Sequence, residues 1–179
     1  MTKSEIQQAL TESHEQFLVY LEGMDGEAFE YSPNEVKWSG GQQLEHIFKS
    51  VQAVAKAFKY PGWLVKWKFG KANRPSRSYD ELVKRYEEKL EKVKGRTAKG
   101  FAPTKTSVSN RAGLCAGTRN AIQSINRSVA KSSDQKLDTL ILPHPLLGKV
   151  TLREMAMFCV YHVGFHHDSV KLIQENRNA

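Results

Sequence analysis

The 179-residue sequence has few cysteines and no long apolar run. Its two cysteines, Cys115 and Cys159, lie far apart and form no CxxC pair. This scarcity excludes a disulfide framework, so we expect both to be reduced, mostly buried thiols. No apolar run approaches the roughly 18 residues that span a membrane, and the N-terminus lacks a stretch of signal-peptide type. We therefore expect a cytoplasmic protein with no membrane association.

Acidic residues are also scarce, with 19 Asp and Glu against 27 Lys and Arg, for a formal net charge of +8. Most of the excess lies in residues 56–105, where Trp63, Trp67 and Phe69 are interspersed among basic residues, as on surfaces that stack nucleic-acid bases. Over residues 84–94, however, glutamates alternate with the cations at helical spacing, which is typical of a solvated helix face. No helix-turn-helix, zinc-finger or RNA-binding signature is present. A nucleic-acid partner is therefore not expected, and an anionic substrate or simple solubility is the better interpretation.

Strand signals are missing as well, because no segment shows period-2 alternation bounded by hairpin turns. Helical periodicity instead predicts four long amphipathic helices. They cover residues 2–24, 39–58, 106–131 and 151–173. Thr2 with Glu5 and Thr151 with Glu154 have the capping-box pattern at helix starts, and Ser39 is a further N-cap.

The predicted fold is all-α, a four-helix bundle in a single domain over residues 1–179. Residues 61–78 form a basic, aromatic-bearing loop, and Ser78 with Glu81 opens a short, charged helix. This loop and additional helix are inserted between the second and third long helices. Residues 140–148 are expected to be a loop.

The last predicted helix carries His162 and His166, which project from one side because they are four residues apart. They share that side with an apolar stripe of Leu152, Met155, Cys159, Val163, Val170 and Ile173. A buried imidazole without a partner costs about 1–3 kcal/mol, and one metal ion would satisfy both rings. Core histidines bonded to protein acceptors are the alternative, and this helix alone leaves both open. Val163 replaces the catalytic glutamate of the HExxH proteases, which excludes that motif.

The remaining histidines differ in their contexts. His14 lies in the middle of the first helix and is interpreted as a partly exposed polar residue. His144 lies between two prolines in the expected loop, and His167 faces away from His166. His46 lies at the border of the apolar stripe of the second helix, beside the small residues Ser50, Ala53 and Ala57. Such neighbours suit either close helix packing or a cleft, and by itself His46 is only a helix-border histidine.

Two segments resemble signatures of the DinB/YfiT-like superfamily. Residues 38–48, WSGGQQLEHIF, resemble its second-helix signature. Residues 143–154, PHPLLGKVTLRE, followed by His162 and His166, resemble its fourth-helix signature. Residues 73–76 and the charged helix after them are similar to the inserted segment of one subgroup. The resemblance spans most of the chain.

This resemblance implies a four-helix bundle with a divalent metal held at one end by His46, His162 and His166. Zinc or nickel is expected, with iron and manganese as alternatives, because imidazole donors alone do not choose among them. Relatives include S-transferases of low-molecular-weight thiols and an isomerase that uses such a cofactor. The implied function is a metal-dependent hydrolase or thiol S-transferase acting on a small molecule, anionic or thiol-bearing. The alternative is a non-catalytic bundle that binds a ligand or partner, with structural histidines.

No catalytic acid or base is assigned. Glu45 points about 100° away from His46 on its helix and is interpreted as a surface residue. Asp168 and Ser169 follow the histidine pair and are candidates for supporting contacts. Four cations could attract an anionic substrate or only solvate a loop; they are Lys66, Lys68, Arg74 and Arg77. Trp63 and Trp67 are candidates to cover the bundle end or to form the interface of a homodimer.

Overall fold

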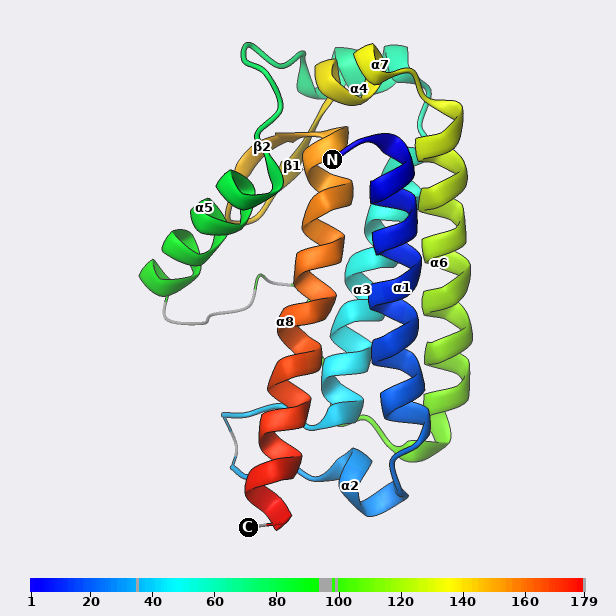
Figure 1. Cartoon of the computed structure of the whole chain (residues 1–179), viewed down its shortest axis with the longest axis vertical. Coiled ribbons are helices and arrows are strands. Elements are labelled where there is room, and N and C mark those ends of the chain that lie inside the picture. Colours follow the sequence, from blue (N-terminus) through cyan, green and yellow to red (C-terminus); the bar gives the residue numbers. More distant parts are fainter. Residues whose placement is uncertain (35, 94–97, 99, 179) are drawn as a thin grey trace.

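The structure is a computed structural model, and it describes residues 1–34, 36–93, 98 and 100–178. Four long helices run along the longest axis of the molecule (Figure 1). They are α1 (Lys3–Glu22), α3 (Gly40–Phe58), α6 (Arg111–Lys131) and α8 (Leu152–Asn178). Both α1 and α3 pack against α6 and α8. The predicted all-α class and four-helix bundle are confirmed.

Shorter elements cover the ends and one side of this bundle. They are α2 (Gly26–Glu30), α4 (Gly62–Phe69), α5 (Tyr79–Lys92), the 3₁₀ turn η1 (Val108–Asn110), α7 (Asp134–Thr139), β1 (Ile141–His144) and β2 (Gly148–Thr151). The predicted additional helix is α5, and α4 forms within the stretch expected to be a basic loop. Glycine disfavours helix interiors, so the sequence predicts that Gly95 ends this helix, but Gly95 lies outside the described residues.

Local sequence signals account for most helix starts. The Thr2–Glu5 and Ser78–Glu81 capping boxes form as predicted, and Ser39 makes a further box with Gln42. At the start of α8, Glu154 N–H donates to Thr151 Oγ1 over 3.1 Å, and Thr151 N–H donates to Glu154 Oε2 over 3.0 Å. The third long helix begins later than expected, because η1 precedes it.

Residues 140–148 are not the expected loop. β1 and β2 form an antiparallel hairpin in which Ile141 pairs with Thr151 and His144 with Gly148. Gly148 has φ of 75°, a conformation that favours glycine. Each strand has only four residues and β1 contains Pro143. Strands this short, one of them interrupted by proline, carry too little period-2 signal to be recognised from sequence.

The predicted apolar stripes meet in one core. All the apolar stripe residues predicted for α8 are buried, and α1, α3 and α6 also contribute buried apolar side chains to the core. Cys115 and Cys159 are buried, free thiols, as expected. A glycine is required at position 117 in the middle of α6, because a Cβ there would lie 2.5 Å from the Phe48 ring of α3. No helix within the described part of the chain is long and apolar enough to cross a membrane.

His14 is buried, with 2% of its surface exposed, and the expectation of a partly exposed residue was wrong. Its Nδ1–H donates to the Leu10 carbonyl over 2.8 Å, while Nε2 has no hydrogen-bond partner among the described residues. Burial lowers the pKa of His14 to about 4, despite the opposing effect of the bond to Leu10. The ring is therefore neutral at pH 7 in the folded protein.

This lowered pKa predicts an acid-sensitive step in stability. Below pH 6.5 the unfolded chain protonates His14 while the folded protein does not, so stability falls until the pH reaches the folded pKa of about 4. We expect this residue to remove about 2 kcal/mol of unfolding free energy between pH 7 and pH 5. Urea unfolding at both pH values, with a chelator present, measures the loss. In His14→Leu and His14→Gln, the loss of unfolding free energy between pH 7 and pH 5 should be smaller by about 2 kcal/mol. An unchanged pH dependence in both variants would contradict the prediction.

Glu154 attaches the inserted segment to the start of α8. Its side chain is fully buried and accepts two bonds from the Arg74 guanidinium, at 2.6 and 2.9 Å. It also accepts the Arg77 backbone N–H at 2.7 Å and the Arg77 guanidinium at 3.2 Å. These contacts hold the chain that enters α5, and α5 packs against α8. Arg74 and Arg77, considered above as cations for an anionic substrate, thus bind Glu154.

The two exposed tryptophans do not cover the bundle end. Trp63 and Trp67 on α4 are 71% and 80% exposed. Only Val65 of α4 is buried. A dimer interface at this helix stays a prediction.

Candidate metal centre

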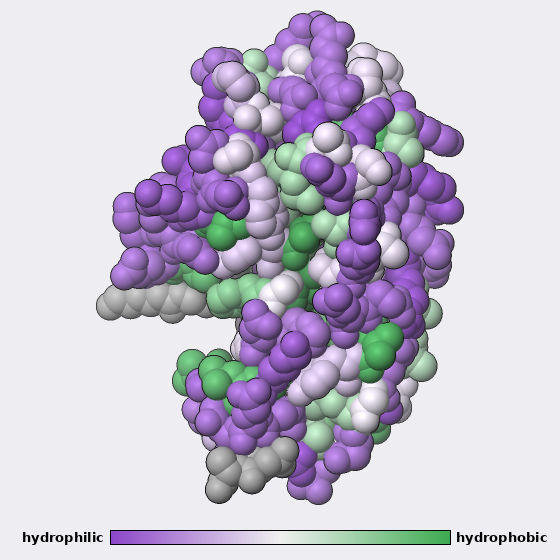
Figure 2. All heavy atoms as spheres, viewed as in Figure 1, coloured by the Kyte–Doolittle hydropathy of each residue, from purple (hydrophilic) through white to green (hydrophobic). Residues whose placement is uncertain are grey.

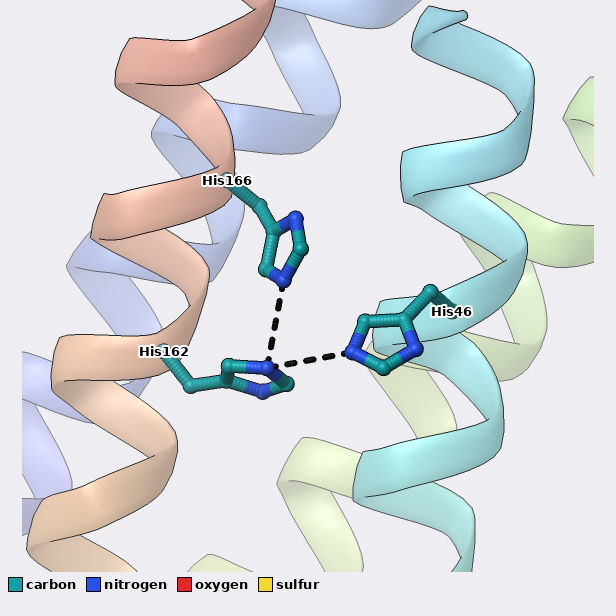
Figure 3. Close-up of side chains that lie close together, drawn as sticks. All are labelled: His46, His162 and His166. Atoms are coloured by element: carbon teal, nitrogen blue, oxygen red, sulfur yellow. Dashed lines mark hydrogen bonds between the residues drawn. The ribbon is translucent and has the colours of Figure 1, made fainter. Parts of the chain in front are cut away.

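Three buried histidines from two helices face one another between α3 and α8 (Figure 3). His162 Nε2 lies 3.1 Å from His46 Nε2 and 3.2 Å from His166 Nε2. The i, i+4 spacing places His162 and His166 one turn apart on α8, and packing of α3 against α8 supplies His46. The structure therefore brings together the three residues that the resemblance implied.

Hydrogen bonds at the far side of two rings determine which nitrogen carries the proton. His46 Nδ1 lies 2.8 Å from the Phe101 carbonyl oxygen, which can only accept, so the proton is on Nδ1. His166 Nδ1 lies 2.8 Å from Gln43 Oε1. Gln43 Nε2 donates to the Trp38 carbonyl and to Ser169 Oγ, which orients its oxygen toward His166. The Nε2 atoms of His46 and His166 consequently carry no proton, and each can offer its lone pair to another group.

The arrangement fits a divalent cation. His162 Nε2 can carry one proton at most, so it cannot fully satisfy the two lone pairs directed at it. A cation bound by all three Nε2 atoms would satisfy them together. Zinc–nitrogen bonds of about 2.0–2.1 Å in a tetrahedral site imply nitrogen separations of about 3.3 Å. The observed 3.1 and 3.2 Å are close to that value. Within the described residues, the group that could hold a metal ion consists of these three histidines.

The electrostatic environment keeps the three rings neutral. Burial lowers the pKa of His162 well below its usual range, and the neighbouring histidines lower it further. Burial likewise lowers the pKa of His166 strongly and that of His46 to a smaller extent. Neutral imidazole is the form that binds a metal, so no proton has to be displaced at pH 7.

Gln43 was not predicted as part of this site. It lies three residues before His46, on the same side of α3, and this spacing in the sequence could have indicated that Gln43 lies near the site. We expect Gln43→Leu to weaken metal binding by about 10–100-fold, because His166 would lose the acceptor that orients its ring. Competition titration against a chromophoric chelator measures this change. Gln43→Glu keeps an acceptor and should retain most of the affinity, and Gln52→Leu, elsewhere on α3, is the matched control. Equal affinities in Gln43→Leu and Gln52→Leu would contradict the prediction.

Two acidic neighbours of the histidines do not reach them. Glu45 accepts bonds from the Thr104 backbone, from Thr106 Oγ1 and from Lys49, so it holds the segment before α6. It points away from His46 as predicted, although it is more buried than a surface residue. Asp168 is exposed. Ser169, the other candidate supporting residue, contacts the site through Gln43.

His144 is a further histidine near the site. The backbone N–H groups of Leu146 and Leu147 donate to its Nδ1 at 3.2 and 3.1 Å, so the ring proton is on Nε2. Burial lowers the pKa of His144 to about 4, which keeps the ring neutral. Its ring lies 4.3 Å from the Phe158 ring, and Phe158 stacks on His162 at 4.9 Å. The hairpin thus places a neutral N–H donor near the three histidines.

A cavity of about 490 Å³ borders His46, His162 and His166 as well as His144. Its walls come from α3, α4, α5, the hairpin, α8 and the segments before α3 and before α6. Figure 2 shows a hollow on this face of the molecule, beside α5, with hydrophobic residues visible inside it. The small residues Ser50, Ala53 and Ala57 line it, so they serve the cleft rather than close helix packing. A ligand in this cavity can therefore contact the three histidines directly.

Comparison with known proteins agrees with this arrangement. The family description that matches the chain is that of the DinB superfamily, over residues 9–169. Searches of curated proteins and of solved structures gave no match. The matched region includes His46, His162 and His166 as well as the insertion and the hairpin. Because the match covers most of the sequence, the chain belongs to the DinB superfamily.

Proposed function

We propose that the protein is a divalent-metal-dependent enzyme whose metal is held by His46, His162 and His166. The observation that supports this proposal is the convergence of three neutral imidazoles on a cavity large enough for a substrate. Structural zinc sites usually have four protein ligands, whereas catalytic sites commonly have three and leave a position open. A bound metal would supply positive charge that favours the ionised form of a water or a thiol.

Among metal-dependent reactions, thiol transfer suits the residues of the cavity better than hydrolysis. No Asp or Glu lines the cavity within the described part of the chain, so no carboxylate is placed to act as a general base on water. Two neutral donors line it: His144 Nε2–H and the hydroxyl of Tyr86, whose pKa burial raises to about 12. Either group can hydrogen-bond to a leaving group. Hydrolysis is the second candidate, since the same three ligands serve both reactions.

The thiol would belong to the substrate and not to the protein. Burial raises the pKa of Cys115 to about 11 and that of Cys159 to about 12, so neither is an activated nucleophile. In the proposed reaction the S–H bond of a low-molecular-weight thiol breaks and its proton passes to the solvent. The sulfur forms a bond to an electrophilic carbon, and the leaving group departs with the electrons of its own bond to that carbon.

Turnover assays with zinc- and nickel-loaded protein test the proposal. One assay combines small thiols with an activated aryl halide, and the other uses p-nitrophenyl esters. We expect turnover of the first pair, with a loss of at least about 100-fold in His46→Ala. His167→Ala, a histidine outside the cavity, is the control and should retain activity.

The competing interpretation is a non-catalytic bundle that binds a ligand. Stoichiometric metal without turnover in either assay would favour it. Protein that binds neither zinc, nickel, iron nor manganese would overturn the metal-dependent proposal itself.

A further inference from the structure

We infer that the molecule bound at this site is predominantly apolar, with its metal-binding group at one end, and that Ala53 and Ala57 set how long it can be. This inference rests on the proposed function for the metal-binding end. For the apolar remainder of the ligand, the inference rests on the cavity alone.

Charge is nearly absent from the cavity wall. Among the described residues that line it, Lys37 alone carries a formal charge, and Lys37 is exposed. The cations of the insertion do not contribute: Lys66 and Lys68 do not line the cavity, and Arg74 and Arg77 bind Glu154. A substrate with several negative charges would therefore lose its hydration without gaining opposite charges.

Several polar groups on the wall already have partners. Gln43 binds His166, Trp38 and Ser169. The Ser50 hydroxyl donates to the His46 carbonyl over 2.8 Å. His144 Nδ1 accepts two backbone N–H groups. A polar body in the cavity would find few groups to replace its bonds to water.

The remaining wall is aliphatic and aromatic. It includes Phe69, Leu90, Leu142, Phe158, Phe165 and Leu172. Of the eight exposed large hydrophobic side chains among the described residues, four line this one cavity: Val36, Tyr60, Phe165 and Leu172. Exposed apolar side chains gathered at a cavity are typical of a binding site for an apolar ligand.

Small side chains extend the cavity along α3. Ser50, Ala53 and Ala57 follow His46 at intervals of three or four residues, so they lie on one side of the helix. From His46 to Ala57 the helix rises by about 16 Å, which is room for an extended chain. The cavity volume of about 490 Å³ lies within the range of about 300–1,000 Å³ that encloses drug-sized ligands. Larger side chains at Ala53 or Ala57 would shorten this space without touching the histidines.

The first test uses cobalt-loaded protein and a series of straight-chain alkyl hydroxamates, whose binding changes the visible spectrum of the metal. We expect affinity to rise by about fourfold per added methylene until the cavity is full. A hydroxamate with a carboxylate at the far end of a chain of equal length should bind at least about tenfold more weakly. Equal affinity along the series, or preference for the carboxylate, would overturn the inference.

The second test needs no metal. Chelated protein is titrated with N-phenylnaphthylamine, a neutral fluorescent probe that brightens in apolar sites. We expect Ala57→Leu and Ala53→Leu to weaken its binding by about 4–15-fold, equivalent to one or two lost methylene contacts, and to shorten the optimum chain in the hydroxamate series. Ala116→Leu, at an exposed position of α6 outside the cavity, should change neither.

The two tests separate the inference from the proposed function. If cobalt does not bind but the probe does, and Ala57→Leu weakens it, the metal-dependent function fails and the apolar cavity stands. If cobalt binds but the hydroxamate affinities are flat, the metal site stands and the inference is overturned. The inference is also overturned if the probe does not bind, or if it binds equally well to Ala57→Leu and Ala116→Leu.

Discussion

His162→Ala is expected to lose stoichiometric metal binding, with an affinity at least about 100-fold below that of the parent protein. His162 is the ligand in contact with both others, because its Nε2 lies 3.1 Å from His46 Nε2 and 3.2 Å from His166 Nε2. Removing a supporting residue of a metal site costs about 10–100-fold in affinity, and removing a ligand should cost more. The variant would retain only two imidazoles, on different helices.

Elemental analysis of untagged, freshly purified protein measures this effect. A thermal scan with and without zinc gives a second readout, because a ligand at about 1,000 times its dissociation constant adds about 4 kcal/mol of stability. That gain should be present in the parent protein and absent in His162→Ala. Circular dichroism verifies that the variant is folded.

His167→Ala is the matched control for this substitution. His167 is the neighbour of His166 on α8, but its ring packs against Phe17 and Tyr20 of α1, at 5.9 and 5.2 Å. Its removal should leave metal content unchanged. Equal metal loss in both variants, or full metal in His162→Ala, would show that the three-histidine site is not the binding site.

Glu154→Gln is expected to destabilise the protein by about 3 kcal/mol, the largest stability effect that we predict for one polar side chain. The carboxylate is fully buried and satisfies Arg74, Arg77 and the Thr151 N–H together. Glutamine has the same shape but only one acceptor oxygen, so at least one of these donors would lose its partner. The arginines are partly exposed, and water can therefore reduce the loss.

Urea unfolding at pH 7 measures this change. Glu81→Gln is the control, because Glu81 has the same capping-box role at the start of α5 but is exposed. It should cost less than about 1 kcal/mol. Equal losses in the two variants would mean that the contacts with Arg74 and Arg77 contribute nothing beyond the cap.

Release of the insertion should accompany the lost stability. Arg74 and Arg77 precede α5, whose Tyr86 ring lies 5.0 Å from the Phe158 ring on α8. Amide hydrogen exchange in α5 should therefore be faster in Glu154→Gln than in Glu81→Gln. Unchanged exchange would indicate that packing against α8 alone holds this helix.

The features that were correctly predicted depend on residues close together in the chain. The capping boxes involve residues three positions apart, and the pair on α8 needs only i, i+4 spacing. His14 was misjudged for a related reason. Its position, four residues after Leu10 and three before Phe17, placed it on the buried stripe, but a polar residue type favoured exposure. His46 was implied by the resemblance and not by its own pattern.

Other features of the site and its surroundings were missed because they depend on distant residues. Nothing near Phe101 indicates that its carbonyl oxygen binds His46, 55 positions away. Glu154 was recognised as a cap, but its partners Arg74 and Arg77 lie 80 and 77 positions earlier. The cavity has no local signature, because its walls come from separate helices, the hairpin and the segments before α3 and before α6.

Residue spacing along the chain was enough to predict the four long helices, the faces that they bury, where most of them start, and the pair of histidines on one side of the last one. These properties follow from spacing and from contacts within one or two turns. The tertiary structure was needed to show that His46 Nε2 lies 3.1 Å from His162 Nε2, although the two residues are 116 positions apart, and that both border an apolar cavity. The reason is physical: which helices adjoin, and how they are rotated, depends on the packing of the whole core and on the connections between helices.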